Sequence, residues 1–313
     1  MSDSNDKHPL YRGPAPGKPA NGREPRPPRG DDGPRMPRPP RRFEQDAARP
    51  PRSRHDGHAV RDEPAGERAA KPKELRIYGL NACLAAFRER PQAIRKLWLL
   101  ESRIPKLQEL LAFCVKHRIG YNVVDADDLD KLTASAHHEG VCLAMAPAAE
   151  IPLSTWLMDL PAGPALAIWL DGVGNPHNLG AILRSAAHFG AQAVLLPKDS
   201  QLAVSGAAAR VAEGGAEHVP MVRLGRDENA VAQLQSAGFV LVTTVVRGGQ
   251  DLFATSLPPR CVLVMGAEQT GVGAPLLAAS GLKVEIPGSG RVESLNVAAA
   301  TAVLLAEWRR QNR

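Results

Sequence analysis

The sequence has few cysteines, few aromatic residues and no long hydrophobic run. Its 313 residues include four cysteines without a C-x-x-C pair, and only 4% of the residues are aromatic. This spacing argues against a disulfide framework or a zinc site, so we expect buried, inert thiols and no metal. No segment approaches the roughly 18 consecutive apolar residues of a membrane span, and the N-terminal stretch is too polar for a signal peptide. We therefore expect a cytoplasmic protein with no membrane partner.

Basic charge and proline are concentrated at the N-terminus. Residues 1–72 contain 16 basic and 11 acidic side chains, which is +5 of the formal +6, and 15 of the 28 prolines. Such a segment buries too little apolar surface to offset its ordering entropy. We predict a disordered Arg/Pro-rich tail over residues 1–73. It is either an arm that contacts RNA phosphates or a solubilising extension without a specific partner.

The rest of the chain is typical of two α/β domains. We predict a small domain over residues 74–147, a connector over 148–164, and a larger domain over 165–313. Several apolar runs of the larger domain are continuous, which favours a parallel sheet covered on both faces. Its predicted strands are 165–171, 192–196, 219–223, 239–246, 261–265 and 283–286.

Helical periodicity is clear in several segments. In the small domain, an amphipathic helix beginning near Ile104 is expected to close at Gly120, and Asp125 is placed to cap a short helix. The last helix is predicted from Leu295 to Arg310. Its apolar stripe would pack on the sheet or on another subunit, and it consists of Val297, Thr301, Leu304 and Trp308.

A glycine-bearing loop joins a strand to a helix within "WLDGVGNPHNLGAILRSAAHFGA", residues 169–191. Its glycines lack the third position of the dinucleotide fingerprint. We expect Asn178 to cap a helix beginning at Leu179, with Leu179 and Ile182 facing the core and Arg184 facing away. Arg184 is then either an ordinary solvent-facing arginine or a ligand for an anion.

Two further loops carry polar groups at strand ends. In "VMGAEQTGVG", residues 264–273, the glycines permit close approach of a ligand, and no GK[ST] follows. Glu268, the only acid there, either binds nearby backbone amides or serves a ligand. In the third loop, Ser294 and Asn296 stand at the start of the last helix, where they are either helix caps or site residues.

The three loops, in this order and spacing, resemble the three motifs of the SpoU/TrmH family of RNA ribose 2′-O-methyltransferases. The resemblance extends from about Tyr78 to Arg310, because "YGLNACLAAF" and "HHEGV" are similar to the family's ribosomal-protein-like substrate-binding domain. It implies a C-terminal trefoil-knotted SPOUT methyltransferase domain that forms a homodimer. A smaller N-terminal α/β substrate-binding domain would precede it in the chain. The implied cofactor is S-adenosylmethionine, bound by the knotted loops. The implied partner is RNA, with ribosomal RNA favoured over transfer RNA.

The resemblance also implies roles for individual residues. Arg184 matches the family's essential arginine, as general base or as electrostatic stabiliser; its permanent charge favours the second role. The polar positions that orient ribose, loop and cofactor correspond to Asn178, Glu268, Ser294 and Asn296. The positions implied to bind the cofactor are Thr244, Gly266, Ile286, Pro287, Leu295 and Asn296.

Two other functions remain as alternatives. One is a non-catalytic RNA-binding or ribosome-assembly factor that retains the methyltransferase fold, against which the intact polar positions argue. The other is a nicotinamide oxidoreductase. For that function, the third glycine is missing, and no acidic residue lies in a suitable context about 20 positions beyond Gly172.

Overall fold

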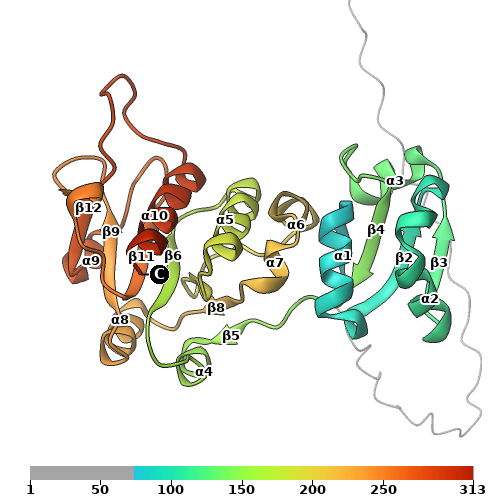
Figure 1. Cartoon of the computed structure of the whole chain (residues 1–313), viewed down its shortest axis with the longest axis horizontal. Helices are drawn as coiled ribbons and strands as arrows, with labels where there is room; N and C mark the ends of the chain where they lie inside the picture. Colours follow the sequence, from blue (N-terminus) through green and yellow to red (C-terminus); the bar gives the residue numbers. More distant parts are fainter. Residues whose placement is uncertain (1–73, 313) are drawn as a thin grey trace, which may run out of the picture. The chain divides into compact units, whose positions relative to one another are not determined.

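Two β-sheets organise the chain (Figure 1). The computed structural model describes residues 74–312, without the side chains of Asp227 and Glu228. The predicted tail, residues 1–73, therefore lies outside the described residues. Within 74–312, no helix has the length and hydropathy needed to cross a membrane.

The first sheet has four strands in the order β1-β4-β2-β3. Strands β1 and β2 are antiparallel to β4, and β3 is parallel to β2. Its strands and helices are β1 (Leu75–Tyr78), α1 (Leu80–Glu89), η1 (Pro91–Ala93), β2 (Ile94–Leu99), η2 (Glu101–Lys106), α2 (Gln108–Lys116), β3 (Gly120–Val123), α3 (Ala126–Thr133) and β4 (Val141–Met145).

Two expectations for this region have different outcomes. The side chain of Asp125 accepts a hydrogen bond from the Asp128 amide at 2.8 Å, which confirms the predicted cap of α3. The prediction of one helix from near Ile104 to Gly120 is wrong at both ends. The residues around Ile104 form the 3-10 helix η2, and α2 ends at Lys116, where Arg118 with φ +56° turns the chain into β3.

The second sheet has eight strands in the order β10-β12-β9-β11-β6-β7-β8-β5, and every pair is parallel, as predicted. The six predicted strands are present. The two-residue strands at both edges of the sheet were not predicted from the sequence. The strands are β5 (Ile151–Pro152), β6 (Ala165–Asp171), β7 (Ala193–Leu196), β8 (Met221–Arg223), β9 (Val240–Thr244), β10 (Gln250–Asp251), β11 (Arg260–Gly266) and β12 (Leu282–Glu285).

Helices cover both faces of this sheet with separate hydrophobic cores, because the strands are apolar on both sides. One core includes residues of α5 (Pro176–Phe189), α6 (Gly206–Ala212) and α10 (Val297–Gln311), with α7 (Gly215–His218) against α5. The other core includes residues of α4 (Leu153–Met158), α8 (Asp227–Ser236) and α9 (Ala274–Ala279). The segment expected to be a connector thus contains β5 and α4, whose Leu153 and Trp156 are buried.

The apolar stripe of the last helix packs inside its own chain. Val297, Thr301, Leu304 and Trp308 are at most 5% exposed, and all but Thr301 belong to the core shared with α5 and the sheet. The expectation that this stripe forms a subunit interface is therefore wrong. Of its two stated alternatives, packing on the sheet is correct.

The four cysteines are all free and buried. Burial raises the pKa of each thiol, and for Cys142 it raises the pKa to about 12. The thiols are therefore protonated and unreactive at neutral pH.

A polar cluster fixes the end of α10. The buried Glu307 carboxylate accepts hydrogen bonds from Arg310 at 2.8 Å and from Gln311 at 2.6 Å. The hydrogen bond from Arg310 is the main cause that lowers the pKa of Glu307 from 4.5 to about 2, against the effect of burial. Gln311 also bonds the backbone of Thr255 and Leu257, so the cluster ties α10 to the loop before β11.

This cluster predicts acid sensitivity. The folded pKa of Glu307 lies below the unfolded value, so its stabilising contribution is complete above pH 4.5 and is lost as pH falls toward about 2. We expect Glu307→Gln to reduce the free energy of unfolding at pH 6, and the difference from the wild type to shrink steadily toward pH 2.5. Urea unfolding at a series of pH values measures this. A difference independent of pH would contradict it.

Candidate functional site

The three loops singled out in the sequence lie at one edge of the second sheet (Figure 1). They follow β6, β11 and β12, which occupy nearby places in the order β12-β9-β11-β6. Because these strands are parallel, their carboxyl ends face the same edge, where open α/β sheets bind ligands. The sheet therefore brings together residues more than 100 positions apart.

The first loop ends in a cap that the sequence analysis assigned wrongly. Helix α5 begins at Pro176, and the Asn175 side chain caps it by accepting from the His177 amide at 2.8 Å. Asparagine followed by proline at the first helical position is a recognised start signal, so this boundary was readable. Asn178 consequently lies within the first turn, where its amide group is available for a long-range contact.

The second loop folds tightly on itself. The Gly271 amide donates to the Ala267 carbonyl at 2.8 Å, and Gly271 has φ +68°. A Cβ atom on Gly266 would overlap the Gly271 backbone. We expected these glycines to admit a ligand; at Gly266 the space is filled by the loop's own backbone. This fold places Glu268 on the exposed part of the loop.

The third loop ends at Asn296, whose side chain acts in two directions. Its Oδ1 caps α10 by accepting from the amides of Ala298 at 2.9 Å and Ala299 at 3.3 Å. Its Nδ2 donates to Glu268 Oε1 at 2.9 Å and to Asn178 Oδ1 at 3.1 Å. The amide is suited to this because acceptor and donor are separate atoms.

A third hydrogen bond links the other two residues: Asn178 Nδ2 donates to Glu268 Oε1 at 3.2 Å. Asn178, Glu268 and Asn296, one from each loop, therefore form a hydrogen-bonded cluster that we call the polar triangle. Glu268 Oε1 receives two N–H donors, while its Oε2 accepts no hydrogen bond from the described part of the chain. The triangle can therefore both brace the three loops and offer a carboxylate oxygen to a ligand.

Arg184 and Ser294 do not join the triangle. Arg184 is exposed on α5, six residues beyond Asn178 and about 9 Å farther along the helix axis. Leu179 and Ile182 are fully buried, as predicted for the opposite face. Within residues 74–312, neither the side chain of Arg184 nor that of the exposed Ser294 makes a hydrogen bond or ion pair. The Arg184 guanidinium is thus available to an anion from outside the chain.

The residues expected to hold a cofactor gather at the same edge. Thr244 ends β9 and donates its hydroxyl to the Val264 carbonyl at 3.2 Å, and Gly266 ends β11. Ile286 and Pro287 directly follow β12, and Leu295 precedes Asn296. Backbone groups of three neighbouring strand ends are therefore available to one ligand.

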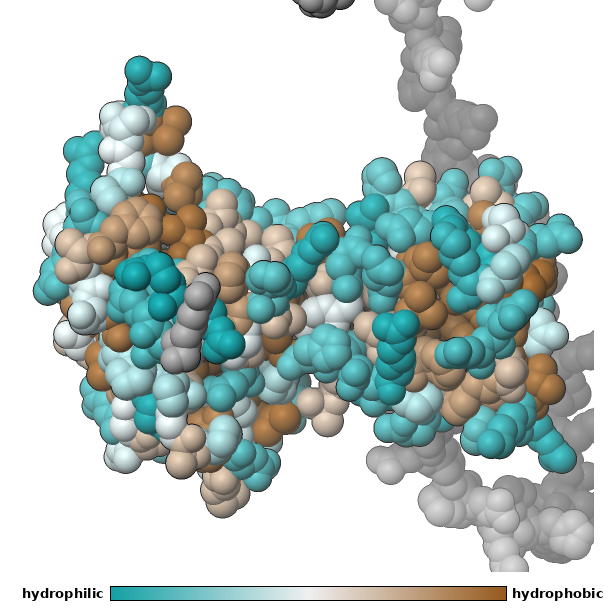
Figure 2. Space-filling view, in the orientation of Figure 1, coloured by the Kyte–Doolittle hydropathy of each residue, from teal (hydrophilic) through white to brown (hydrophobic). Residues whose placement is uncertain are grey.

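This edge also exposes apolar side chains. Val292 is 73% exposed and Leu295 is 47% exposed on the loop before α10, and Val246 is 55% exposed on the loop after β9. Figure 2 shows hydrophobic residues among polar ones on the loop before α10. Such side chains fit the apolar part of an organic cofactor. The sequence analysis missed Val246 and Val292, whose only signal was an apolar residue in a polar loop.

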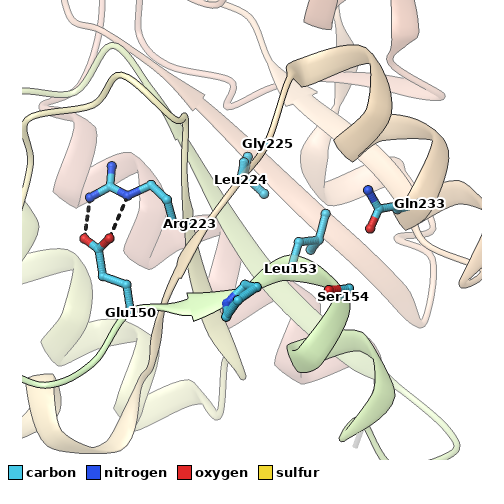
Figure 3. Close-up of a pocket in the computed structure, with 8 residues that line it drawn as sticks. Glu150, Leu153, Ser154, Arg223, Leu224, Gly225 and Gln233 are labelled. Carbon is cyan, nitrogen blue, oxygen red and sulfur yellow. Dashed lines mark hydrogen bonds and ion pairs between the residues drawn. The ribbon is translucent and has the colours of Figure 1, made fainter.

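A pocket elsewhere on the sheet offers no comparable site. It lies beside the edge strand β5 and its neighbour β8 and includes Leu153 and Gln233 (Figure 3). Arg223 there donates to the Glu150 carboxylate and, through Nη1, to the carbonyls of Pro197 and Ser200. The guanidinium therefore serves to join segments of the chain.

The two adjacent histidines form part of a turn. His138 is buried; its Nδ1 accepts from the Gly140 amide at 2.9 Å, and its Nε2 lies 3.3 Å from Asp130. Among residues 74–312, no group of three or more His, Cys, Asp or Glu side chains is arranged to hold a metal.

Comparison with known proteins gives family matches over both sheets. Residues 165–306 match the model of the SpoU rRNA Methylase family, and residues 76–150 match that of RNA 2′-O ribose methyltransferase substrate binding. An uncharacterized tRNA/rRNA methyltransferase of Escherichia coli O157:H7 is 40% identical over 246 residues, covering 79% of this chain and 71% of that relative. The 23S rRNA (guanosine-2′-O-)-methyltransferase of Pseudomonas putida is 34% identical over 240 residues, covering 75% of this chain and 96% of that relative.

Solved structures agree with these relatives. The AdoMet-bound rRNA methyltransferase from Sinorhizobium meliloti superposes with a TM-score of 0.65 at 26% identity. The superposition covers 76% of this chain and 87% of that one.

The two functions of the Asn296 amide predict separable effects on stability. We expect Asn296→Ala to lose about 1 kcal/mol of unfolding free energy because the cap of α10 is lost. Asn296→Ser keeps a capping oxygen and should stay within about 0.5 kcal/mol of the wild type, although it cannot donate to Glu268. Denaturant unfolding of both variants measures this. Equal losses in the two would show that the cap is not what stabilises the helix.

Proposed function

The chain belongs to the SpoU family of rRNA methylases, and from this premise we propose that it transfers a methyl group from S-adenosylmethionine to a ribose 2′-hydroxyl of ribosomal RNA. Its cofactor is S-adenosylmethionine, and it is an RNA 2′-O-methyltransferase. Ribosomal RNA is favoured over transfer RNA because the Pseudomonas putida relative, nearly all of which aligns with this chain, carries that substrate in its name.

The polar triangle is the observation that carries this proposal. It joins Asn178, Glu268 and Asn296 at the carboxyl ends of the strands and leaves Glu268 Oε2 without a hydrogen bond from the described residues. A non-catalytic RNA-binding factor can use the triangle as a brace for its loops, but it has no use for a carboxylate oxygen open to a ligand. The triangle therefore supports an enzyme over the alternative that only retains the fold.

The cofactor would be held by the strand ends beside the triangle. In this proposal Thr244, Gly266, Ile286 and Pro287 present backbone and hydroxyl groups, with Leu295 supplying apolar contact and Asn296 bracing the loop. When bound, S-adenosylmethionine supplies an electrophilic methyl group on its sulfonium sulfur. The chain must hold the ribose oxygen about 3 Å from that carbon, and positioning of this kind supplies about 7–11 kcal/mol of a barrier.

The remaining residues act on the RNA. We assign Asn178, Glu268 and Ser294 to orienting the ribose and the loops around it. Arg184 carries a permanent charge, so its role is to bind a neighbouring phosphate and stabilise negative charge developing on the 2′-oxygen, rather than to remove the proton. The proton of the 2′-hydroxyl passes to solvent water as the methyl group is transferred. Its exposure and its lack of a partner among the described residues support contact with a ligand.

The proposal extends to the threading and assembly of the larger domain. We propose a trefoil knot formed by the segments around Gly266 and residues 286–296, supported by the contact of Asn296 with both earlier loops.

We also propose a cytoplasmic homodimer. The dimer would use the outer side of α10, where small residues are exposed or half-buried and lie outside the core: Ala299, Ala302 and Ala306.

Methyl transfer to purified RNA tests the proposed function. The protein is incubated with tritiated S-adenosylmethionine and with ribosomal or transfer RNA from cells that lack the gene, and the label is mapped to single nucleotides. We expect label at a ribose of ribosomal RNA. Label confined to transfer RNA would change the substrate, and RNA binding without transfer would support the non-catalytic alternative.

Arg184→Ala should nearly abolish methyl transfer while leaving the melting temperature and cofactor binding near wild type. The reason is that Arg184 is exposed and its side chain has no partner to lose among residues 74–312. Thermal melts, calorimetric titration with S-adenosylmethionine and the tritium assay provide the three measurements. Arg226→Ala, an exposed arginine before α8, is the matched control. Turnover equal to that of the control would remove Arg184 from the mechanism.

Light scattering at micromolar concentration should give twice the mass of one chain. Ala302→Arg should shift the protein toward the monomer, because a long charged side chain would separate helices that pack through alanine. A monomeric wild type would refute the dimer, and a dimeric Ala302→Arg variant would place the interface elsewhere.

A further inference from the structure

Asp171 joins two of the three site loops, although it belongs to neither the polar triangle nor the residues expected to bind the cofactor. It is the last residue of β6, and its Oδ2 accepts a hydrogen bond from the Gly273 amide at 2.7 Å. Gly273 stands at the far end of the loop that carries Glu268. In the parallel register, Asp171 pairs with Gly266, where that loop begins. Asp171 thus contacts both ends of the second loop, through the backbone pairing of its strand at Gly266 and through its carboxylate at Gly273.

The surrounding backbone leaves little room for another arrangement. A Cβ atom on Gly273 would lie 3.3 Å from Asp171 Oδ2, so glycine permits the short bond. A Cβ atom on Gly172, the next residue, would lie 3.3 Å from the Ala267 side chain, and Gly172 has φ +73°. The first and second loops are therefore in close contact at two neighbouring points before they meet again at Asn178 and Glu268.

Glu268 lies between these fixed points. The Gly271 amide donates to the Ala267 carbonyl and so closes the turn that contains Glu268. Two residues beyond this turn, the loop is held at Gly273. A closed turn anchored at both ends has few alternative conformations, so the Glu268 carboxylate is presented to Asn178 and Asn296 in one place. Without the bond to Asp171, the far end of the loop is held only by the packing of its neighbours Val272 and Leu276 in the core.

We propose that Asp171 is a positioning residue for methyl transfer, acting through the bond to Gly273 that fixes the loop of Glu268. This rests on the proposed function. Asp171 makes no contact with the triangle itself, so its effect is on geometry. Displacement of catalytic groups by about 1 Å can cost up to about 100-fold in rate, and such a loss falls on kcat rather than on binding of RNA.

The chain supplies a matched control at the other end of β6. There the Leu166 amide of β6 donates to Oε1 of Gln192, the residue before β7, at 3.1 Å. This too is a bond from a backbone amide to a side chain, but it lies away from the site. Gln192→Ala therefore reports the cost of losing such a bond in general. Asp171→Asn keeps an acceptor oxygen for Gly273 and tests whether the bond, rather than the charge, is what matters.

The experiment compares Asp171→Ala, Asp171→Asn and Gln192→Ala in methyl transfer and in amide hydrogen exchange. We expect Asp171→Ala to lower kcat at least about tenfold with little change in KM for RNA, and to speed exchange over residues 267–273. Asp171→Asn should recover most of the rate, and Gln192→Ala should behave like the wild type in both measurements.

Two kinds of result would overturn the proposal. The first is a kcat that shows no specific effect, because it is unchanged in Asp171→Ala or falls equally in Gln192→Ala. The other is a fall in kcat without faster exchange over 267–273, which would mean that Asp171 acts on the substrate directly. If the wild type methylates no RNA, the proposed function fails instead, and the exchange measurement still decides whether Asp171 fixes the loop.

Discussion

The Asn296 side chain is the contact on which the site depends. Through its oxygen it starts α10, and through its nitrogen it holds the loops that follow β6 and β11. The helix that covers the sheet and the polar groups at the sheet's edge are therefore fixed by the same amide. Packing and chemistry are coupled here, because the register in which α10 buries its stripe is also the one that brings Asn296 to Glu268.

Two glycines of the second loop allow the backbone to pack closely around the site. At Gly266 the absence of a side chain lets the second loop close over its own start, and at Gly273 it lets a carboxylate approach the amide. From the sequence these glycines were expected to permit close approach of a ligand, yet in the structure they mainly allow the chain to approach itself. A glycine-rich strand end therefore indicates close approach without identifying what approaches.

Much of the larger domain could be predicted from its sequence. Continuous apolar runs such as that of β11 predict buried parallel strands, and all six predicted strands are present. The two-residue edge strands β5 and β10 carry no such signal, because so few paired residues show no period. The buried stripe of α10 was found by its spacing, but spacing does not reveal whether a helix meets its own sheet or a second subunit. The cap of α5 was misplaced because Asn175 and Asn178 are equivalent in residue type, and the proline between them was not used.

The candidate site was only partly readable. The motifs named Asn178, Glu268 and Asn296, but their mutual hydrogen bonds depend on strand order, which no local pattern contains. Asp171 was passed over because a single acid at a strand end has no distinctive signal. Arg184 illustrates the opposite case: its exposure was predicted from helical phase, while its contribution depends on a ligand.

The long sequence separation within the triangle has a consequence for biosynthesis. Asn178 and Asn296 are 118 positions apart. A ribosome that has made the first loop must therefore extend the chain through six more strands before the last partner emerges. Contacts of such separation form late. A nascent or prematurely terminated chain that stops short of α10 displays the first two loops without the residue that joins them, so methylation competence is acquired in one late step.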